Sequence, residues 1–217
     1  MQIWHRFLAA CLSLGMPLTA LAEPAATPAG PASDPFDSPL IQEIQALHTV
    51  AESGDKDATK NLVSRLETLS AAHPADQLIR AYLGSAYTLA SRDAMPGPKK
   101  FEYLKTGLKT MDAAVDADPT AVAPRFIRAV NNFHLPAFIH RRDNARADFE
   151  TLLSQIDSGA TQLNPATCQA IHYYAGLAFK QLRRPSEARD AWQRGLQFDL
   201  TSVLAEKINA ELKKLKT

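Results

Sequence analysis

The sequence predicts an all-α fold built from helical hairpins, and three observations carry that prediction. Residues 170–199 read as two short amphipathic helices joined by a tight turn, because apolar side chains recur there at helical spacing. An apolar, a small and an aromatic residue stand in the same order twice, as Leu83, Gly84 and Tyr87 and as Ala175, Gly176 and Phe179. The rest of the chain from residue 38 alternates amphipathic stretches with turns that contain proline, glycine or aspartate.

The first 22 residues have the features of a secretory signal peptide. The segment before Phe7 carries one basic residue, Phe7–Leu18 is an apolar run of suitable length, and residues 20–22 read Ala-Leu-Ala, which fits an A-x-A cleavage site. We therefore expect cleavage after Ala22 and a mature chain that begins at Glu23. The mature protein is then periplasmic or secreted.

Two alternatives to cleavage after Ala22 do not fit the length of the apolar run. Residues 8–11 have the letters of a lipoprotein box, but cleavage before Cys11 leaves an apolar run of about four residues, below the ~7 that a signal peptide needs. An uncleaved anchor needs about 20 apolar residues, more than this run contains. We expect no stable membrane span after cleavage.

Composition and net charge limit the kinds of partner that this protein can bind. The chain has 217 residues, of which 46% are hydrophobic and 22% charged, as in a soluble domain with a real core. Loss of the signal peptide leaves 23 of the 24 basic residues against 23 acidic ones, so the mature net charge is zero. This balance argues against a nucleic-acid partner, which favours a basic protein. It also gives no reason to expect binding to anionic membranes.

Cys168 is the one cysteine that remains after cleavage, so an intramolecular disulfide is excluded. We expect it to be a small buried residue near the start of a helix. Pairing with a second chain is the alternative.

The first part of the mature chain divides into a linker and a helical pair. Residues 23–37 are rich in proline and alanine and are predicted to be a disordered linker, followed by a helical domain over 38–217. Ser38 and Pro39 predict a helix start. Gly54 and Asp55 end this helix, and Asp57 is the predicted cap of the next.

Two further hairpins contain expanded turns. Asp76 opens the second hairpin, whose helices are separated by a predicted loop over 91–99, and Asp118 with Pro119 closes it. In the third hairpin the corresponding turn covers residues 134–142.

The fourth hairpin begins at Asn164 and Pro165, and Pro185 suits the first turn of its second helix. Gly176 lies inside the first helix, where it predicts close approach of a neighbouring helix. A final helix over 201–217 is expected to cover the end of the array with one apolar side.

Residues 170–199 resemble a tetratricopeptide repeat (TPR). The small, aromatic, small, aromatic, apolar and acidic places of that family are occupied by Gly176, Phe179, Ala188, Trp192, Leu196 and Asp199. Departures from the family pattern are His172, Gly195 and Leu200. The resemblance extends less strongly over the chain from Leu40 to Thr217. It implies a right-handed α-solenoid with a C-terminal capping helix, in which the first helix of each hairpin lines a concave groove.

Candidate partner-binding residues follow from projecting this pattern onto the groove. The aromatic and basic candidates are Tyr82, Phe126, Phe133, Tyr173 and Lys180. Aromatic anchors with polar neighbours suit an extended peptide or a partner helix. The alternative is that these side chains pack between repeats.

The turn over 134–142 is the most unusual local feature, because apolar residues are followed directly by His140, Arg141 and Arg142. One interpretation is a lid or docking loop in which Arg141 and Arg142 bind partner carboxylates. The other is that the turn folds back on its own hairpin.

No motif for catalysis is found in the sequence. The histidines show no zinc-ligand spacing, and no nucleophile elbow, Walker or dinucleotide-binding glycine pattern occurs. The alternatives are a metal held by His134, His140 and Asp143, and a nucleophile at Cys168 with His172 as base. We expect no enzyme activity, no cofactor and no metal.

The function that the sequence supports is binding. We expect a non-catalytic scaffold of the cell envelope that holds a protein or peptide in a groove. The alternative is a small-solute-binding accessory protein of a periplasmic transport system, which a closed aromatic pocket would favour.

Overall fold

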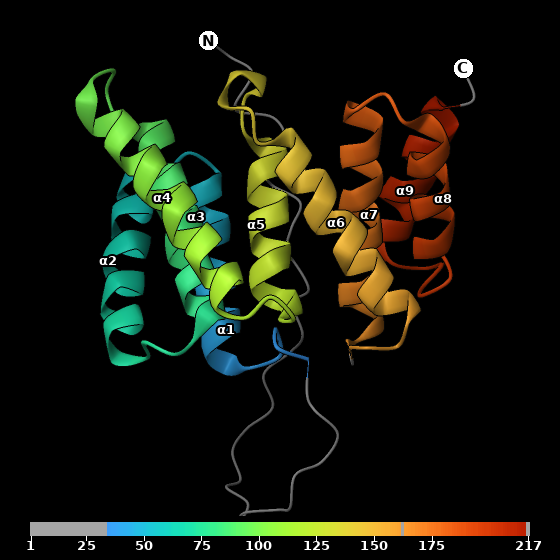
Figure 1. Cartoon of the computed structure of the whole chain (residues 1–217), viewed down its shortest axis with the longest axis horizontal. Helices are drawn as coiled ribbons and strands as arrows, with labels where there is room; N and C mark the ends of the chain where they lie inside the picture. Colours follow the sequence, from blue (N-terminus) through green and yellow to red (C-terminus); the bar gives the residue numbers. More distant parts are fainter. Residues whose placement is uncertain (1–33, 162, 216–217) are drawn as a thin grey trace, which may run out of the picture. The chain divides into compact units, whose positions relative to one another are not determined.

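A computed structural model describes residues 34–161 and 163–215, and these residues form nine α-helices and one short 3-10 helix (Figure 1). In chain order they are α1 (Pro39–Glu52), α2 (Lys56–Ala72), α3 (Gln77–Asp93), α4 (Pro98–Ala117), α5 (Val122–His134), η1 (Ala137–Ile139), α6 (Arg142–Asp157), α7 (Pro165–Gln181), α8 (Pro185–Gly195) and α9 (Val203–Lys214). The predicted signal peptide and the first part of the predicted linker, residues 23–33, lie outside the described residues. Residues 34–37 form a turn in which Asp34 accepts a hydrogen bond from the Phe36 N–H at 2.9 Å.

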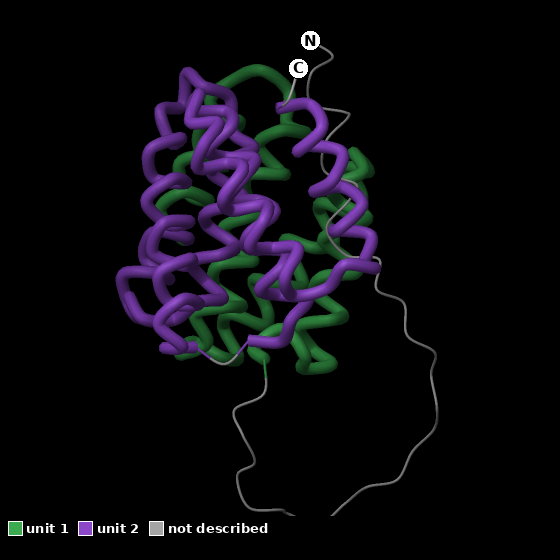
Figure 2. Tube along the Cα trace, turned by 90° about the vertical axis from the view of Figure 1, so that its right-hand side faces the viewer, with its two compact units in different colours: residues 1–110 green, residues 111–217 purple. Residues whose placement is uncertain are grey.

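The helices pack in sequential pairs within two compact units, residues 1–110 and residues 111–217, with the boundary inside α4 (Figure 2). In the first unit α1 packs on α2, α2 on α3, and α1 also on α3. In the second unit each helix from α5 to α9 packs on the next, and α7 also contacts α5 and α9. The prediction of an all-α protein with paired helices is confirmed.

Several predicted helix starts are confirmed by their caps. The side chains of Ser38, Asp76 and Asn164 each accept a hydrogen bond from a backbone N–H of the first helical turn. Each such bond satisfies a donor that the helix itself leaves unpaired. The cap predicted for α2 was two residues off, because Asp55 and not Asp57 caps it. Asp57 lies in the first turn and pairs with Lys60.

Two other boundaries differ from the prediction. The expected loop over 91–99 is shorter, since α3 continues to Asp93 and α4 already begins at Pro98. Proline is compatible with the first turn of a helix, where its missing N–H is not required. Helix α8 ends at Gly195, so Leu196 and Phe198 lie beyond it.

The two units have separate sets of fully buried apolar side chains. In the first unit these are Ile44 of α1, Leu62 and Leu66 of α2, and Ile79 of α3. In the second unit they include Phe149, Leu152, Ile171, Trp192 and Ile208. Each set joins helices that are neighbours in the chain, which is how a helical hairpin buries its apolar stripe.

Gly176 of α7 lies directly beneath the indole of Trp192 of α8, as its position in the sequence predicts. A Cβ atom at this position would lie 2.2 Å from Trp192 Nε1 and 2.5 Å from Cδ1. The indole is fully buried, and its Nε1 donates a hydrogen bond to the Tyr173 carbonyl at 3.0 Å. The indole is therefore fixed in position and cannot yield to an added methyl group.

We predict that Gly176→Ala destabilises the protein by about 1–3 kcal/mol, although alanine is the better helix former, because the methyl group overpacks the α7–α8 contact. Urea unfolding measures the change. Trp192→Leu removes the clashing ring, so the double variant should lose less than the sum of the two single losses. Strict additivity would contradict the assigned contact.

His172 of α7 is a buried histidine with 1% of its surface exposed. Its ring lies 5.5 Å from the ring of Phe198, and its Nδ1 is buried without a hydrogen-bond partner. Burial lowers the pKa of His172 from 6.5 to about 4, against a smaller opposing effect of a hydrogen bond to the backbone of Ala191. The imidazole is therefore neutral in the folded protein above that pH.

This shift predicts a loss of stability in mild acid. The unfolded chain takes up a proton near pH 6.5 while the folded protein does so only near pH 4, so the free energy of unfolding falls as the pH drops through this window. We expect His172 to account for about 2–3 kcal/mol of that loss. His172→Leu should reduce the dependence between pH 4 and 7 and leave the part that a second buried histidine, His134, contributes, whereas His73→Gln, at an exposed position, should leave it unchanged.

Candidate functional site

Aromatic side chains gather where α5 packs on α7. Tyr174 of α7 is their centre, with ring centroids 6.2 Å from Phe126 and 6.5 Å from Phe133 of α5, both edge-on. The neighbouring Tyr173 ring lies 5.2 Å from Tyr174. Tyr174 is buried, whereas the other three are half-buried. We call Phe126, Phe133, Tyr173 and Tyr174 the aromatic cluster. Three of its members were predicted from the sequence.

His134 ends α5 beside this cluster. Its ring lies 4.6 Å from Phe133 and 6.2 Å from Tyr174, and its Nε2 is buried without a hydrogen-bond partner. Removal from water lowers the pKa of His134 to about 4. The imidazole is therefore uncharged at neutral pH and extends the apolar surface of the cluster.

Lys180, another predicted contact, lies near the C-terminal end of α7. Its Nζ is 2.5 Å from Glu211 Oε2 of α9, and Lys214 pairs with the same carboxylate. Burial raises the pKa of Glu211, but the hydrogen bonds from the two lysines outweigh burial and leave it below its usual value. Lys180 thus joins α7 to α9.

Arg141 and Arg142, the predicted contacts of the expanded turn, lie at the start of α6. Arg141 donates to Asp112 Oδ1 at 2.5 Å and to Asn132 Oδ1 at 3.2 Å. Arg142 has a buried Nε. Arg141 is therefore occupied by groups of its own unit, as the fold-back interpretation of this turn requires.

The turn between α5 and α6 is partly folded back on its own hairpin. Leu135 is buried at 7% exposure, and His140 closes η1 in the left-handed region at φ 57°. Phe138 points away, with 73% of its surface exposed. The apolar residues of this turn therefore divide between the interior and the surface.

A buried ionic network between α5 and α6 was not predicted from the sequence. Asp148 of α6, with 2% of its side chain exposed, accepts from Arg128 at 2.7 and 2.9 Å and from Arg125 at 3.0 Å. Arg128 also lies 3.3 Å from Asp112, which Arg141 contacts. A buried carboxylate requires such partners, because an unpaired charge is strongly disfavoured in the interior. The network therefore joins α5, α6 and the last turns of α4.

Tyr82 of α3, the predicted contact of the first unit, is buried with 3% of its surface exposed. Its ring lies 5.8 Å from His48 of α1, edge-on. It therefore packs between α1 and α3, which is the alternative that the sequence left open for the groove residues.

A serine, a histidine and a glutamate form a hydrogen-bonded series beside Tyr82. His48 Nδ1 lies 2.8 Å from Glu52 Oε1, and His48 Nε2 lies 2.9 Å from Ser85 Oγ. A nucleophile, a base and an orienting carboxylate are connected in this order in serine hydrolases. Ser85 is in the middle of α3 and only 4% exposed. An acyl substrate has no accessible surface there, so we assign the series a structural role in joining α1 to α3.

This assignment predicts no reaction at Ser85. A fluorophosphonate probe should leave Ser85 unlabelled, as judged by intact-protein mass spectrometry. Ser85→Ala should instead lower the free energy of unfolding by about 1–3 kcal/mol, because it leaves a nitrogen of the mostly buried His48 imidazole without its partner. Labelling that disappears in Ser85→Ala and in His48→Gln would contradict a purely structural role.

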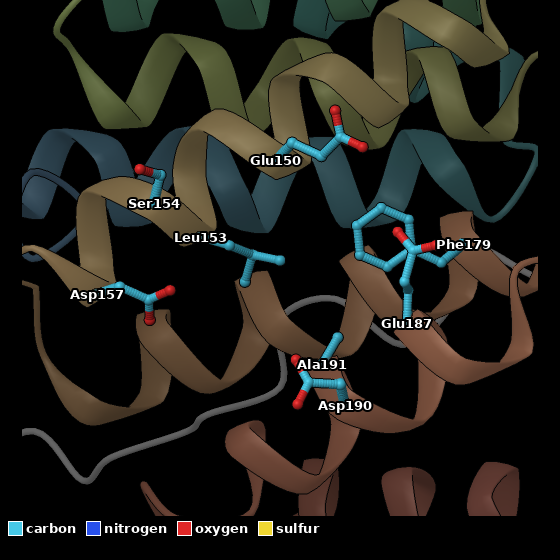
Figure 3. Close-up of a pocket in the computed structure, with 8 residues that line it drawn as sticks. All are labelled: Glu150, Leu153, Ser154, Asp157, Phe179, Glu187, Asp190 and Ala191. Atoms are coloured by element: carbon cyan, nitrogen blue, oxygen red, sulfur yellow. The ribbon is translucent and has the colours of Figure 1, made fainter.

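A groove of about 280 Å³ lies between α6 and α8, and Phe179 of α7 also lines it (Figure 3). Its lining is acidic and apolar, and comprises Glu150, Leu153, Ser154, Asp157, Phe179, Glu187, Asp190 and Ala191. Arg184 pairs with Glu150 at 3.0 Å and with Glu187 at 2.5 Å. Arg194 pairs with Asp157 and, at 3.6 Å, with Asp190. All four carboxylates therefore have an arginine partner from this unit.

Within the described residues, no cluster of histidine, cysteine and carboxylate side chains has the arrangement of a metal site. Cys168 is a buried free thiol. None of the helices over 34–161 and 163–215 is both long enough and apolar enough to cross a bilayer.

Comparison with known proteins adds no relative, since no family model, no curated protein and no solved structure matches this chain.

Proposed function

We propose that this chain is a non-catalytic scaffold of the cell envelope, a short TPR-like array that holds a protein or peptide segment. The observation that carries the proposal is the aromatic cluster between α5 and α7. Phe126, Phe133 and Tyr173 keep part of their surface accessible while Tyr174 fixes their arrangement from below. Half-buried aromatic rings on a rigid support lose little conformational entropy on binding, which is why they serve as anchors.

The helix arrangement supports the same proposal. Helix α7 contacts α5 and α9 in addition to its chain neighbours, and α1 contacts α3 in the same way. In a TPR-like array this second-neighbour packing places the first helices of successive hairpins side by side along the binding face. Export to the periplasm is supported by the signal-like features of residues 1–22.

The partner chemistry follows from the cluster. Neutral aromatic surface, extended by the uncharged imidazole of His134, favours apolar side chains of a bound segment. The ammonium group of Lys180 is paired with Glu211, and 37% of the Lys180 side chain is still exposed. It offers one hydrogen bond at the far end of α7 to a backbone carbonyl or carboxylate of the partner.

Site-directed photo-crosslinking tests this function. A benzoylphenylalanine placed at Tyr173 should crosslink a protein or peptide from periplasmic extract, whereas the same group at the exposed Phe138 should not. Phe133→Leu should reduce crosslinking from position 173 several-fold, because it removes an aromatic anchor with little change in apolar volume. Circular dichroism verifies that each variant keeps its helices.

Two outcomes would contradict the scaffold. Equal crosslinking from both positions would mean that the cluster does not select the partner. A small molecule that co-purifies in native mass spectrometry, is lost in Tyr173→Ala, and occurs without any crosslinked protein would favour a solute-binding accessory protein.

A further inference from the structure

The first unit exposes two large apolar side chains where α4 begins. Met95, in the turn before α4, is 79% exposed, and Phe101, in the first turn of the helix, is 68% exposed. Figure 1 shows this turn and the start of α4 at one end of the first unit. Two large apolar side chains so fully exposed within seven residues are unfavourable in water, so they indicate a surface that contacts something else.

The first part of α4 is also rich in lysine. Residues 98–109 contain Lys99, Lys100, Lys105 and Lys109 against one acidic residue, Glu102, a local excess of three positive charges. Lys100 donates to the backbone carbonyls of Ser91, at 2.7 Å, and of Arg92 and Ala94. Among residues 34–161 and 163–215, no carboxylate forms an ion pair with any of the four. The mature chain is neutral overall, so this excess is local.

The helix register places both kinds of residue on its outer side. Phe101, Lys105 and Lys109 are four residues apart and share one face. Gly107 marks the opposite, inner face, where a Cβ atom would lie 2.6 Å from the Gly84 carbonyl oxygen and 2.9 Å from Thr88 Cγ2. Leu104 and Leu108 lie half-buried along the edge beside Phe101.

The patch is held rigidly. Besides the Lys100 bonds to the turn, Ser91 donates to the Lys100 carbonyl at 2.8 Å. The ring of Tyr103 stacks on Tyr87 with centroids 6.2 Å apart, and Lys99 lies 5.4 Å above the Tyr103 ring. The start of α4, which carries Phe101, is therefore anchored to the preceding turn and to α3.

We propose that Met95, Phe101, Lys105 and Lys109, the α4 patch, dock on the surface of an anionic phospholipid membrane. Apolar side chains enter the headgroup boundary while lysines face lipid phosphates, as in interfacial amphipathic helices. The patch is a helix end with a projecting turn, and a lipid surface requires no complementary groove. This surface is independent of the aromatic cluster, which lies in the second unit.

Vesicle co-sedimentation tests the proposal. The protein used is the chain from Glu23, because removal of residues 1–22 removes no described residue and takes away the apolar run that would itself bind lipid. It is incubated at 0.1 M NaCl with vesicles of phosphatidylcholine alone or with 30% phosphatidylglycerol. We expect at least about tenfold stronger partitioning into the anionic vesicles, and a loss of most of that preference at 0.5 M NaCl.

Variants assign the binding to the patch. Lys105→Gln with Lys109→Gln should weaken partitioning about tenfold or more, and Phe101→Ala should weaken it several-fold at unchanged charge. The matched control, Lys56→Gln with Lys60→Gln, removes the same charge from exposed positions of α2 and should have no such effect. Thermal unfolding confirms that all variants remain folded.

The proposal is overturned if the protein does not sediment with anionic vesicles, binds neutral vesicles equally well, or is weakened as much by the α2 control as by the α4 variants. Binding to soluble polyglutamate tests the alternative partner, an acidic protein. Patch-dependent binding to polyglutamate without binding to vesicles would assign the surface to an acidic protein.

Discussion

The contact between Trp192 and Gly176 sets the arrangement of the second unit. The fully buried indole of Trp192 on α8 packs over Gly176, the one residue of α7 that lacks a side chain. Its N–H donates a hydrogen bond to the Tyr173 carbonyl. This contact fixes how α7 is rotated about its own axis. With Trp192 on one side, Tyr174 must point to the other, where it meets the aromatic residues of α5. A core contact thus determines the surface that the proposed function uses.

Charge contributes a second constraint, between α5 and α6. Asp148 is buried and depends on two arginines of α5, so the two helices are held in one relative register. A buried ion pair adds little net stability compared with apolar packing, but removal of one partner leaves an unpaired charge and is costly. Such pairs favour a unique arrangement, and here the arrangement is the one that places Phe126 and Phe133 toward α7.

The sequence predicted the helices well because their signals are local. Caps at Ser38, Asp76 and Asn164 and the apolar spacing each depend on a few neighbouring residues. The close approach of a helix at Gly176 could also be predicted, because glycine destabilises a helix interior and is usually found there only where a neighbour packs closely. The start of α4 was misjudged, since proline and glycine in one short stretch favour a loop as readily as a helix beginning at proline.

The sites were less predictable because the residues that form each of them are distant from one another in the sequence. The series of Ser85, His48 and Glu52 joins residues up to 37 positions apart, and Arg128 meets Asp148 across 20 positions. Periodicity gives the face on which a residue lies but not the neighbour that it meets. For the same reason Tyr82 and Arg141 were assigned to a binding surface, whereas each contacts groups within its own unit.

The glycines at helix contacts also bear on how this protein can diverge. At Gly107, Gly176 and Gly195 any side chain would collide with a neighbouring helix within 3 Å, while the apolar residues around them can exchange with others of similar volume. Over evolutionary time the apolar residues should therefore be replaced faster than these three glycines. A search pattern built on their spacing of 69 and 19 residues, with tryptophan 16 positions after the second, would detect distant relatives that overall sequence identity does not.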